Sequence, residues 1–157
     1  MAILLACMGK AYAAPEADIT QNLRFGSFIP RNNDSVYSIV IETDGGMTSD
    51  SGLVPTGEPP LPQNGVIQLT GFTDGDEVTI SFEPEDGLEL VCDDCSGAPT
   101  FTVDDFVTDP ASSITIDGSG EATVNFGASL YTSGSGIRYA GGNYAGTVTV
   151  NVVIDEI

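Results

Sequence analysis

The chain of 157 residues is long enough for one domain and too short for two, and 41% of its residues are hydrophobic, so it can bury a sizeable core. Twenty-three acidic residues against four basic ones give a formal net charge of −19. This balance argues against nucleic-acid and anionic-lipid partners, which need a cationic surface, and the lack of histidine removes the usual general base near neutral pH.

The first residues have the pattern of a secretion signal. An apolar run leads to Ala11-Tyr12-Ala13, which fits the small-x-small motif of a signal cleavage site. Residues 1–13 are therefore predicted to be a removed signal peptide and residues 14–157 a single domain. The basic region that normally opens a signal is missing, which suggests a leader truncated by a start codon placed too late. The leader is too short to span a bilayer, which needs about 20 residues.

Two alternatives stay open for this segment. Cys7 could be the acylation site of a lipoprotein, although Leu5 fits poorly two residues before that cysteine. An ordinary cytosolic N-terminus is the other alternative, and the alanine-rich end of the leader argues against it. With a removed signal peptide, the mature protein is expected to be secreted, either extracellular or at the cell surface.

Segments with apolar residues at every second position recur along the rest of the chain, and Gly-, Pro- and Asp-rich turns separate them. This period is typical of a β-strand with one buried face, and no segment after the leader has helical periodicity over three turns. Strands are predicted over residues 18–28, 35–43, 65–72, 77–84, 87–92, 100–106 and 144–154, a hairpin over 112–130, and loops over 43–65 and 132–146. Seven to nine short strands separated by turns predict an antiparallel β-sandwich.

Two cysteines remain if Cys7 leaves with the leader, and they form the motif Cys92-Asp-Asp-Cys95. In an oxidising compartment this pair is expected to form a short-loop disulfide. A thioredoxin-like redox site requires a helix after the first cysteine, whereas a strand-like run precedes this one, and the two aspartates would raise the thiol pKa. A zinc site would need two further ligands, and no other histidine or cysteine is left to supply them.

Other candidate sites have simpler interpretations. Asp74, Asp76 and Glu77 offer oxygens to a Ca²⁺ ion, but the spacing matches no EF-hand, and a solvated Asp-Gly turn is the favoured interpretation; no cofactor is expected. The tyrosines near the 132–146 loop could form a contact patch or anchor the loop to the core: Tyr131, Tyr139 and Tyr144. No nucleophile has a visible base, so we expect no enzyme.

Three motifs in order resemble one known family. They are LRFGSFIP (23–30), GSGEATVNFGASL (118–130) and GGNYAGTVTVNVV (141–153). Together they resemble the bacterial domain-of-unknown-function family numbered forty-four oh-two, over nearly the whole mature chain. The resemblance implies a secreted, immunoglobulin-like (pilin-like) β-sandwich of the kind found beside surface or fimbrial genes, and it implies no enzymatic activity.

The strands at both ends of the domain are the candidates for assembly. Their alternating apolar residues are Ile19, Leu23 and Phe25 at the start and Val148, Val150, Val152 and Ile154 at the end. Sandwich domains polymerise when a segment of a neighbour fills an open groove. Residues 14–22 are a poor donor because Pro15 lacks an N–H and the acidic residues would face apolar pockets. Intramolecular pairing of the last strand is therefore the favoured interpretation.

The expected role is that of a structural subunit of an extracellular filament or fimbria-like appendage, assembled by β-strand pairing. Its expected partners are further copies of the chain or other surface subunits, with no nucleic acid and no direct membrane span. The alternative is a monomeric adhesin, or a carbohydrate- or cation-binding module, that is displayed at the cell surface and binds its ligand with the 132–146 loop.

Overall fold

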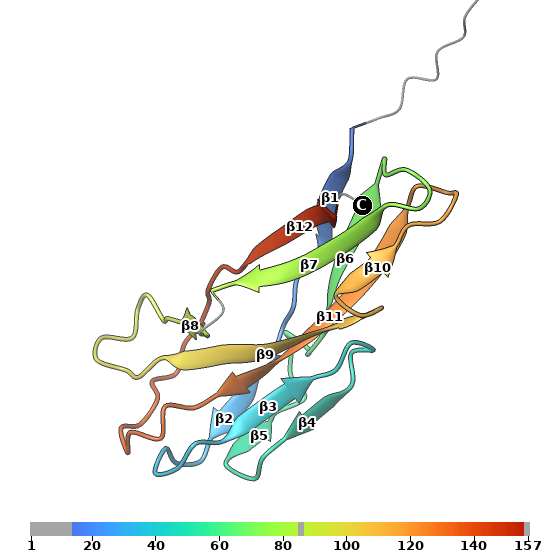
Figure 1. Ribbon diagram of the computed structural model, residues 1–157. Coiled ribbons are helices and arrows are strands. Elements are labelled where there is room, and N and C mark those ends of the chain that lie inside the picture. Colours follow the sequence, from blue (N-terminus) through green and yellow to red (C-terminus); the bar gives the residue numbers. More distant parts are fainter. Residues whose placement is uncertain (1–13, 85–86, 156–157) are drawn as a thin grey trace, which may run out of the picture.

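The computed structural model describes residues 14–84 and 87–155, so the predicted signal peptide and Cys7 lie outside the described residues (Figure 1). All the regular secondary-structure elements of the described residues are β-strands. The strands are β1 (Glu16–Gln21), β2 (Phe28–Pro30), β3 (Ser38–Ile41), β4 (Met47–Ser49), β5 (Leu53–Pro55), β6 (Gly65–Thr70), β7 (Glu77–Glu83), β8 (Leu88–Leu90), β9 (Phe101–Asp109), β10 (Ser113–Thr115), β11 (Ala122–Tyr131) and β12 (Thr149–Asp155).

The strands form a large sheet, a small sheet and a two-stranded ribbon. The long strand β11 is the centre of the large sheet: it pairs with β6, β3 and β9, while β1, β4 and β8 extend that sheet outward. The small sheet has the order β10-β7-β12, and β2 pairs with β5 to form the ribbon. All these pairings are antiparallel, and the predicted antiparallel β-sandwich is confirmed.

Two clusters of apolar side chains form the core because β6, β7 and the first half of β9 bury alternate residues, while β11 buries five residues in a row from Phe126 to Leu130. The upper cluster lies between the large and the small sheet and contains Ile67, Leu69, Phe72, Val78, Ile80, Ile114, Ile116, Val124 and Phe126. The lower cluster contains Ile39, Ile41, Leu53, Phe101, Val103, Ala128 and Leu130. The ribbon β2–β5 covers the lower cluster only in part, and that partial cover leaves room for the site described below.

Two sequence predictions about this part of the chain are wrong. Residues 112–130 do not form a hairpin, because β10 pairs with β7 in the small sheet and β11 belongs to the large one. Ile114 and Val124 point into the same core from opposite sides, so the Asp117–Gly120 turn crosses between the sheets. The predicted loop 43–65 contains β4 and β5, which are short and therefore leave little periodic signal.

The last strand pairs inside the molecule, as the sequence favours, but its partner is distant in the chain. All seven residues of β12 pair with β7, from Thr149 opposite Glu83 to Asp155 opposite Glu77. Val150 and Val152 pack against the upper cluster, whereas Val153 is 53% exposed on the other face. The alternation along β12 therefore separates a core face from a solvent face.

This separation predicts different effects for the same substitution on the two faces of β12. We expect Val150→Asp to lower the free energy of unfolding by about 2–4 kcal/mol, because it places an unpaired carboxylate against the core. Val153→Asp on the solvent face should change it by less than about 0.5 kcal/mol. Urea titration followed by circular dichroism measures both values, and equal losses would show that β12 does not pack as described.

Candidate functional site

A groove of about 1070 Å³ opens over the lower cluster, between the chain that leads into β2 and the chain that leads into β12. One wall is the continuous segment 22–30 and the other is the continuous segment 139–148. Each wall has nine or ten residues, which corresponds to about 30 Å of extended chain. The floor between the walls is apolar and consists of Leu88, Leu90, Phe101, Val103, Phe106, Phe126 and Leu130.

Each wall has one edge that is already paired and another that is free. Arg24 exchanges two backbone hydrogen bonds of 2.9 Å with Gln63, and Ala145 exchanges bonds of 2.9 and 3.0 Å with Val91. In an antiparallel pair of this kind, the peptide groups of the flanking residues point to the opposite side.

These flanking residues line the groove, and their peptide groups have no partner. Leu23 and Phe25 flank Arg24 in one wall, and Tyr144 and Gly146 flank Ala145 in the other. Within the described part of the chain, no backbone hydrogen bond involves any of these four residues. The groove therefore presents unpaired backbone from both sides above an apolar floor.

Aromatic rings hold the 139–148 wall onto the floor. The ring of Tyr139 stacks on that of Phe101 with a centroid distance of 4.0 Å and an interplanar angle of 8°. Tyr144 meets the edge of Phe101 at 4.9 Å, and Phe28 of the opposite wall meets the same ring at 5.4 Å. Phe101 is 1% exposed, so it anchors both walls to the core.

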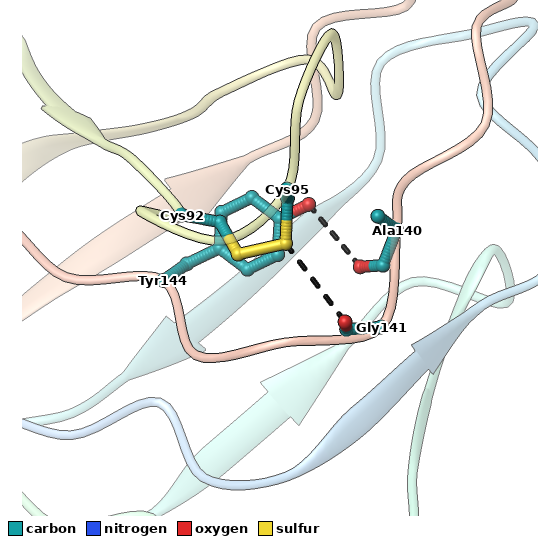
Figure 2. Close-up of a disulfide and its surroundings, with 5 residues drawn as sticks. All are labelled: Cys92, Cys95, Ala140, Gly141 and Tyr144. Carbon is teal, nitrogen blue, oxygen red and sulfur yellow. Dashed lines mark hydrogen bonds between the residues drawn. A yellow bond between two sulfur atoms is a disulfide. The ribbon is translucent and has the colours of Figure 1, made fainter.

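A disulfide supports the same wall from outside. The predicted Cys92–Cys95 bond is present, and it lies directly against the two glycines that follow Ala140 (Figure 2). A Cβ atom built on Gly142 would lie 2.6 Å from each of the two sulfur atoms. The Tyr144 hydroxyl donates a hydrogen bond of 3.2 Å to the carbonyl of Ala140 and closes this turn. Only glycine fits at position 142 as long as the disulfide is present.

A buried asparagine fixes the loop that precedes this wall. The side-chain amide of Asn33, which is 2% exposed, donates to the hydroxyls of Ser133 and Ser135 and to the Ile137 carbonyl, and its oxygen accepts from the Gly134 N–H. These bonds, of 2.8–3.1 Å, satisfy the donors of a side chain that would be costly to bury unpaired. Asn33 thereby joins the end of one wall to the start of the other.

The three candidate tyrosines do not lie together. Tyr139 and Tyr144 are half-buried in the groove, and burial raises the pKa of the Tyr144 phenol above its ordinary value of 10. Tyr131 lies at the end of β11 and donates a hydrogen bond to the Asp105 carboxylate, which raises the pKa of that phenol. The structure therefore places two of the three tyrosines at one site and the third on the β9–β11 pair.

The residues predicted to carry assembly fall into overlapping groups. Ile19, Leu23, Phe25 and Val148 line the groove. Leu23, Phe25, Val150 and Val152 pack against the core clusters of their own molecule, and Ile154 is 39% exposed near the chain end.

The candidate metal ligands serve a turn. The Asp76 carboxylate accepts a hydrogen bond of 2.8 Å from the Thr73 N–H, and Asp74 and Glu77 are exposed on either side of it. Nowhere in residues 14–84 and 87–155 do three or more acidic or cysteine side chains gather in a way that could hold a metal ion.

Sequence reasoning did not find the groove, and in particular it missed Phe28, Leu88 and Leu90. One local signal was available. An arginine stands between an apolar and an aromatic residue in Leu23-Arg24-Phe25 and again in Ile137-Arg138-Tyr139, and these triplets belong to or adjoin the two walls. The same alternation is also the ordinary pattern of a strand with one buried face, so it does not by itself identify a groove wall.

The fold and the groove together define an antiparallel β-sandwich with an open groove over an apolar floor. A family model described as Domain of unknown function (DUF4402) matches residues 17–153, and the chain belongs to this family. No curated protein and no solved structure matches the chain. Across the described residues, no helix has the length and apolar character needed to cross a membrane.

The contact between Gly142 and the disulfide predicts a coupled effect. Gly142→Ala should lower the free energy of unfolding by about 1–3 kcal/mol, because the added methyl group overlaps both sulfur atoms. Gly141→Ala is the matched control, since a Cβ there meets no atom within 4 Å. Chemical denaturation of both variants measures the difference.

A double-mutant cycle isolates the cause. When Cys92 and Cys95 are both replaced by alanine, the cost of Gly142→Ala should disappear, because the opposing sulfur atoms are gone. An unchanged cost in that background would mean that the disulfide does not restrict position 142.

Proposed function

We propose that the chain is a structural subunit of an extracellular filament or fimbria-like appendage, and that copies associate by β-strand addition into the groove. The observation that carries the proposal is the pair of unpaired backbone edges that face each other across an apolar floor. An added strand gains main-chain hydrogen bonds from sheet edges and specificity from pockets for alternate side chains. The groove offers both, and it offers an edge on each side.

The exposure of the surrounding residues supports the same conclusion. Ile29 lines the groove and remains 59% exposed. An added strand would cover apolar surface of this kind, which contributes roughly 25 cal/mol for each Å² removed from water. Exposed apolar surface beside unpaired strand edges otherwise favours uncontrolled aggregation, so a specific occupant resolves a liability of the fold.

The last strand is not the one that copies exchange in this proposal. Because β12 pairs with β7 along its whole length, it stays with its own molecule, and the groove beside it receives a strand from a neighbour. The partners are further copies of the chain or related surface subunits. A location outside the cell agrees with the disulfide, which persists in oxidising compartments. We propose no enzymatic activity.

The alternative role, a monomeric adhesin or a carbohydrate-binding module, has less support. Sugar-binding sites use exposed aromatic faces, whereas the ring of Tyr139 is stacked on Phe101 and Tyr144 packs against the same residue. The 132–146 loop is held by Asn33 and the disulfide rather than presented as a free platform.

One substitution in the groove wall tests the proposal. Ile29→Asp replaces an exposed side chain of the wall, so the fold should persist while association is lost, because a carboxylate enters an apolar strand site. Val153→Asp introduces the same charge on an exposed face outside the groove and should leave association unchanged. Light scattering of the purified chain, and electron microscopy of material sheared from producing cells, measure the difference.

Two outcomes would contradict the proposal. One is a parent chain that stays monomeric and is missing from sheared filaments, which would direct the search to ligands of the groove. The other is an Ile29→Asp chain that assembles as well as the Val153→Asp chain, which would place the subunit contact on another surface.

A further inference from the structure

The lining of the groove contrasts with the acidic composition of the chain. The chain has 23 acidic residues, yet no aspartate or glutamate lies among the described residues that line the groove. An added strand would therefore meet no opposing carboxylate inside the site. Elsewhere the surface would repel an acidic segment.

The cations of the domain gather at this same place. Arg24 lines the groove, Arg31 directly follows the last residue of one wall, and Arg138 directly precedes the first residue of the other. All three side chains are exposed. These are the only basic residues after the predicted leader.

Two of these arginines mark the same end of the groove. Asn33, two residues after Arg31, donates a hydrogen bond of 2.9 Å to the carbonyl of Ile137, the neighbour of Arg138. Figure 1 shows this end near β2, while β1 and β12 lie at the opposite end. Arg31 and Arg138 therefore place two positive charges at one end of the groove, beside its apolar floor.

We infer that the strand that fills the groove is an acidic one, namely β1 (Glu16–Gln21) of a second copy of this chain, which begins after Pro15, and that its carboxylates pair with the arginines at the rim. This inference rests on the proposed strand addition and adds the identity and charge of the occupant. The segment alternates Glu16 and Asp18 with Ala17 and Ile19. Alternation along a strand directs Ala17 and Ile19 to the floor while both carboxylates point outward to the rim. The acidic residues therefore need not enter the apolar floor.

The segment is also the strand that the fold holds least firmly. It forms β1, an edge strand with a single ladder to β6, and five of its six residues are exposed. Transfer to a neighbouring groove gives up little buried surface. In its own molecule β1 pairs along one edge, with β6, whereas in a neighbour's groove it would pair along both edges, because both walls of the groove have free edges.

Charge exchange between two copies tests this inference. One chain carries Glu16→Lys and Asp18→Lys, and the other carries Arg31→Glu and Arg138→Glu at the end of the groove where these two arginines lie; all four positions are exposed, so both chains should fold as the parent does. Each altered chain alone should associate about tenfold more weakly than the parent, since two rim pairs become repulsive. An equimolar mixture should regain association, because the lysines introduced into one chain face the glutamates introduced into the other.

A matched control separates specific pairing from total charge. Glu42→Lys with Glu77→Lys changes the net charge by the same amount as the two lysine substitutions in β1, at exposed positions outside the groove. Sedimentation velocity at fixed salt compares all chains and the mixture, and this control should associate no more weakly than the parent. Fixed salt is required because added salt screens both the pairing and the overall repulsion.

The outcomes distinguish the inference from the proposed function. Altered chains that associate as well as the parent, or a mixture that does not recover, would overturn the charge pairing while Ile29→Asp still blocks assembly. A parent chain that does not associate at all would overturn both.

Discussion

The arrangement of this domain depends on the two edges of β11. Along one edge this strand pairs first with β6 and then with β3, and along the other it pairs with β9. The two partners on the shared edge meet at Gly127, where a Cβ atom would lie 2.0 Å from the Ile41 carbonyl oxygen. Only a residue without a side chain allows both strands to reach β11 there. Gly127 therefore permits one strand to span two core clusters.

The two clusters are covered differently, and this difference creates the groove. The small sheet β10-β7-β12 packs over the upper cluster with regular ladders. Over the lower cluster, the cover consists of the ribbon β2–β5 and the irregular segment 139–148, whose Ala145 forms an isolated bridge with Val91, the residue after β8. Two partial covers meet there without pairing with each other. An apolar floor with free backbone on both sides is the result.

The sequence predicts the local elements well because each carries its own signal. The alternation in β7 and β12, the strand pair β8–β9 and the disulfide between Cys92 and Cys95 are all visible in short stretches. The sequence cannot show to which sheet a strand belongs. Residues 112–130 have the periodicity of a hairpin, yet β10 lies in the small sheet and β11 in the large one, because both turn their apolar faces toward the core between the sheets. The partner of β12 lies about 70 residues earlier and leaves no local trace.

The groove itself was beyond sequence reasoning because backbone makes it. Its walls come from two distant segments, and what sets them apart is that, among the described residues, the peptide groups of residues such as Leu23 and Tyr144 form no backbone–backbone hydrogen bond. The side chains there resemble those of ordinary core strands. The acidic surface was predictable from composition, but the position of the arginines relative to the groove was not, since it follows from the Asn33 contacts between the two wall ends.

The disulfide has a consequence for the order of events during folding. It joins residues only three positions apart, so it removes little conformational entropy from the unfolded chain and contributes little to the stability of the sandwich as a whole. The sheets can form while both thiols are still reduced. In the proposed assembly, oxidation would then immobilise one wall of the groove on a domain that has already folded, so folding and readiness to receive a strand would be separate steps.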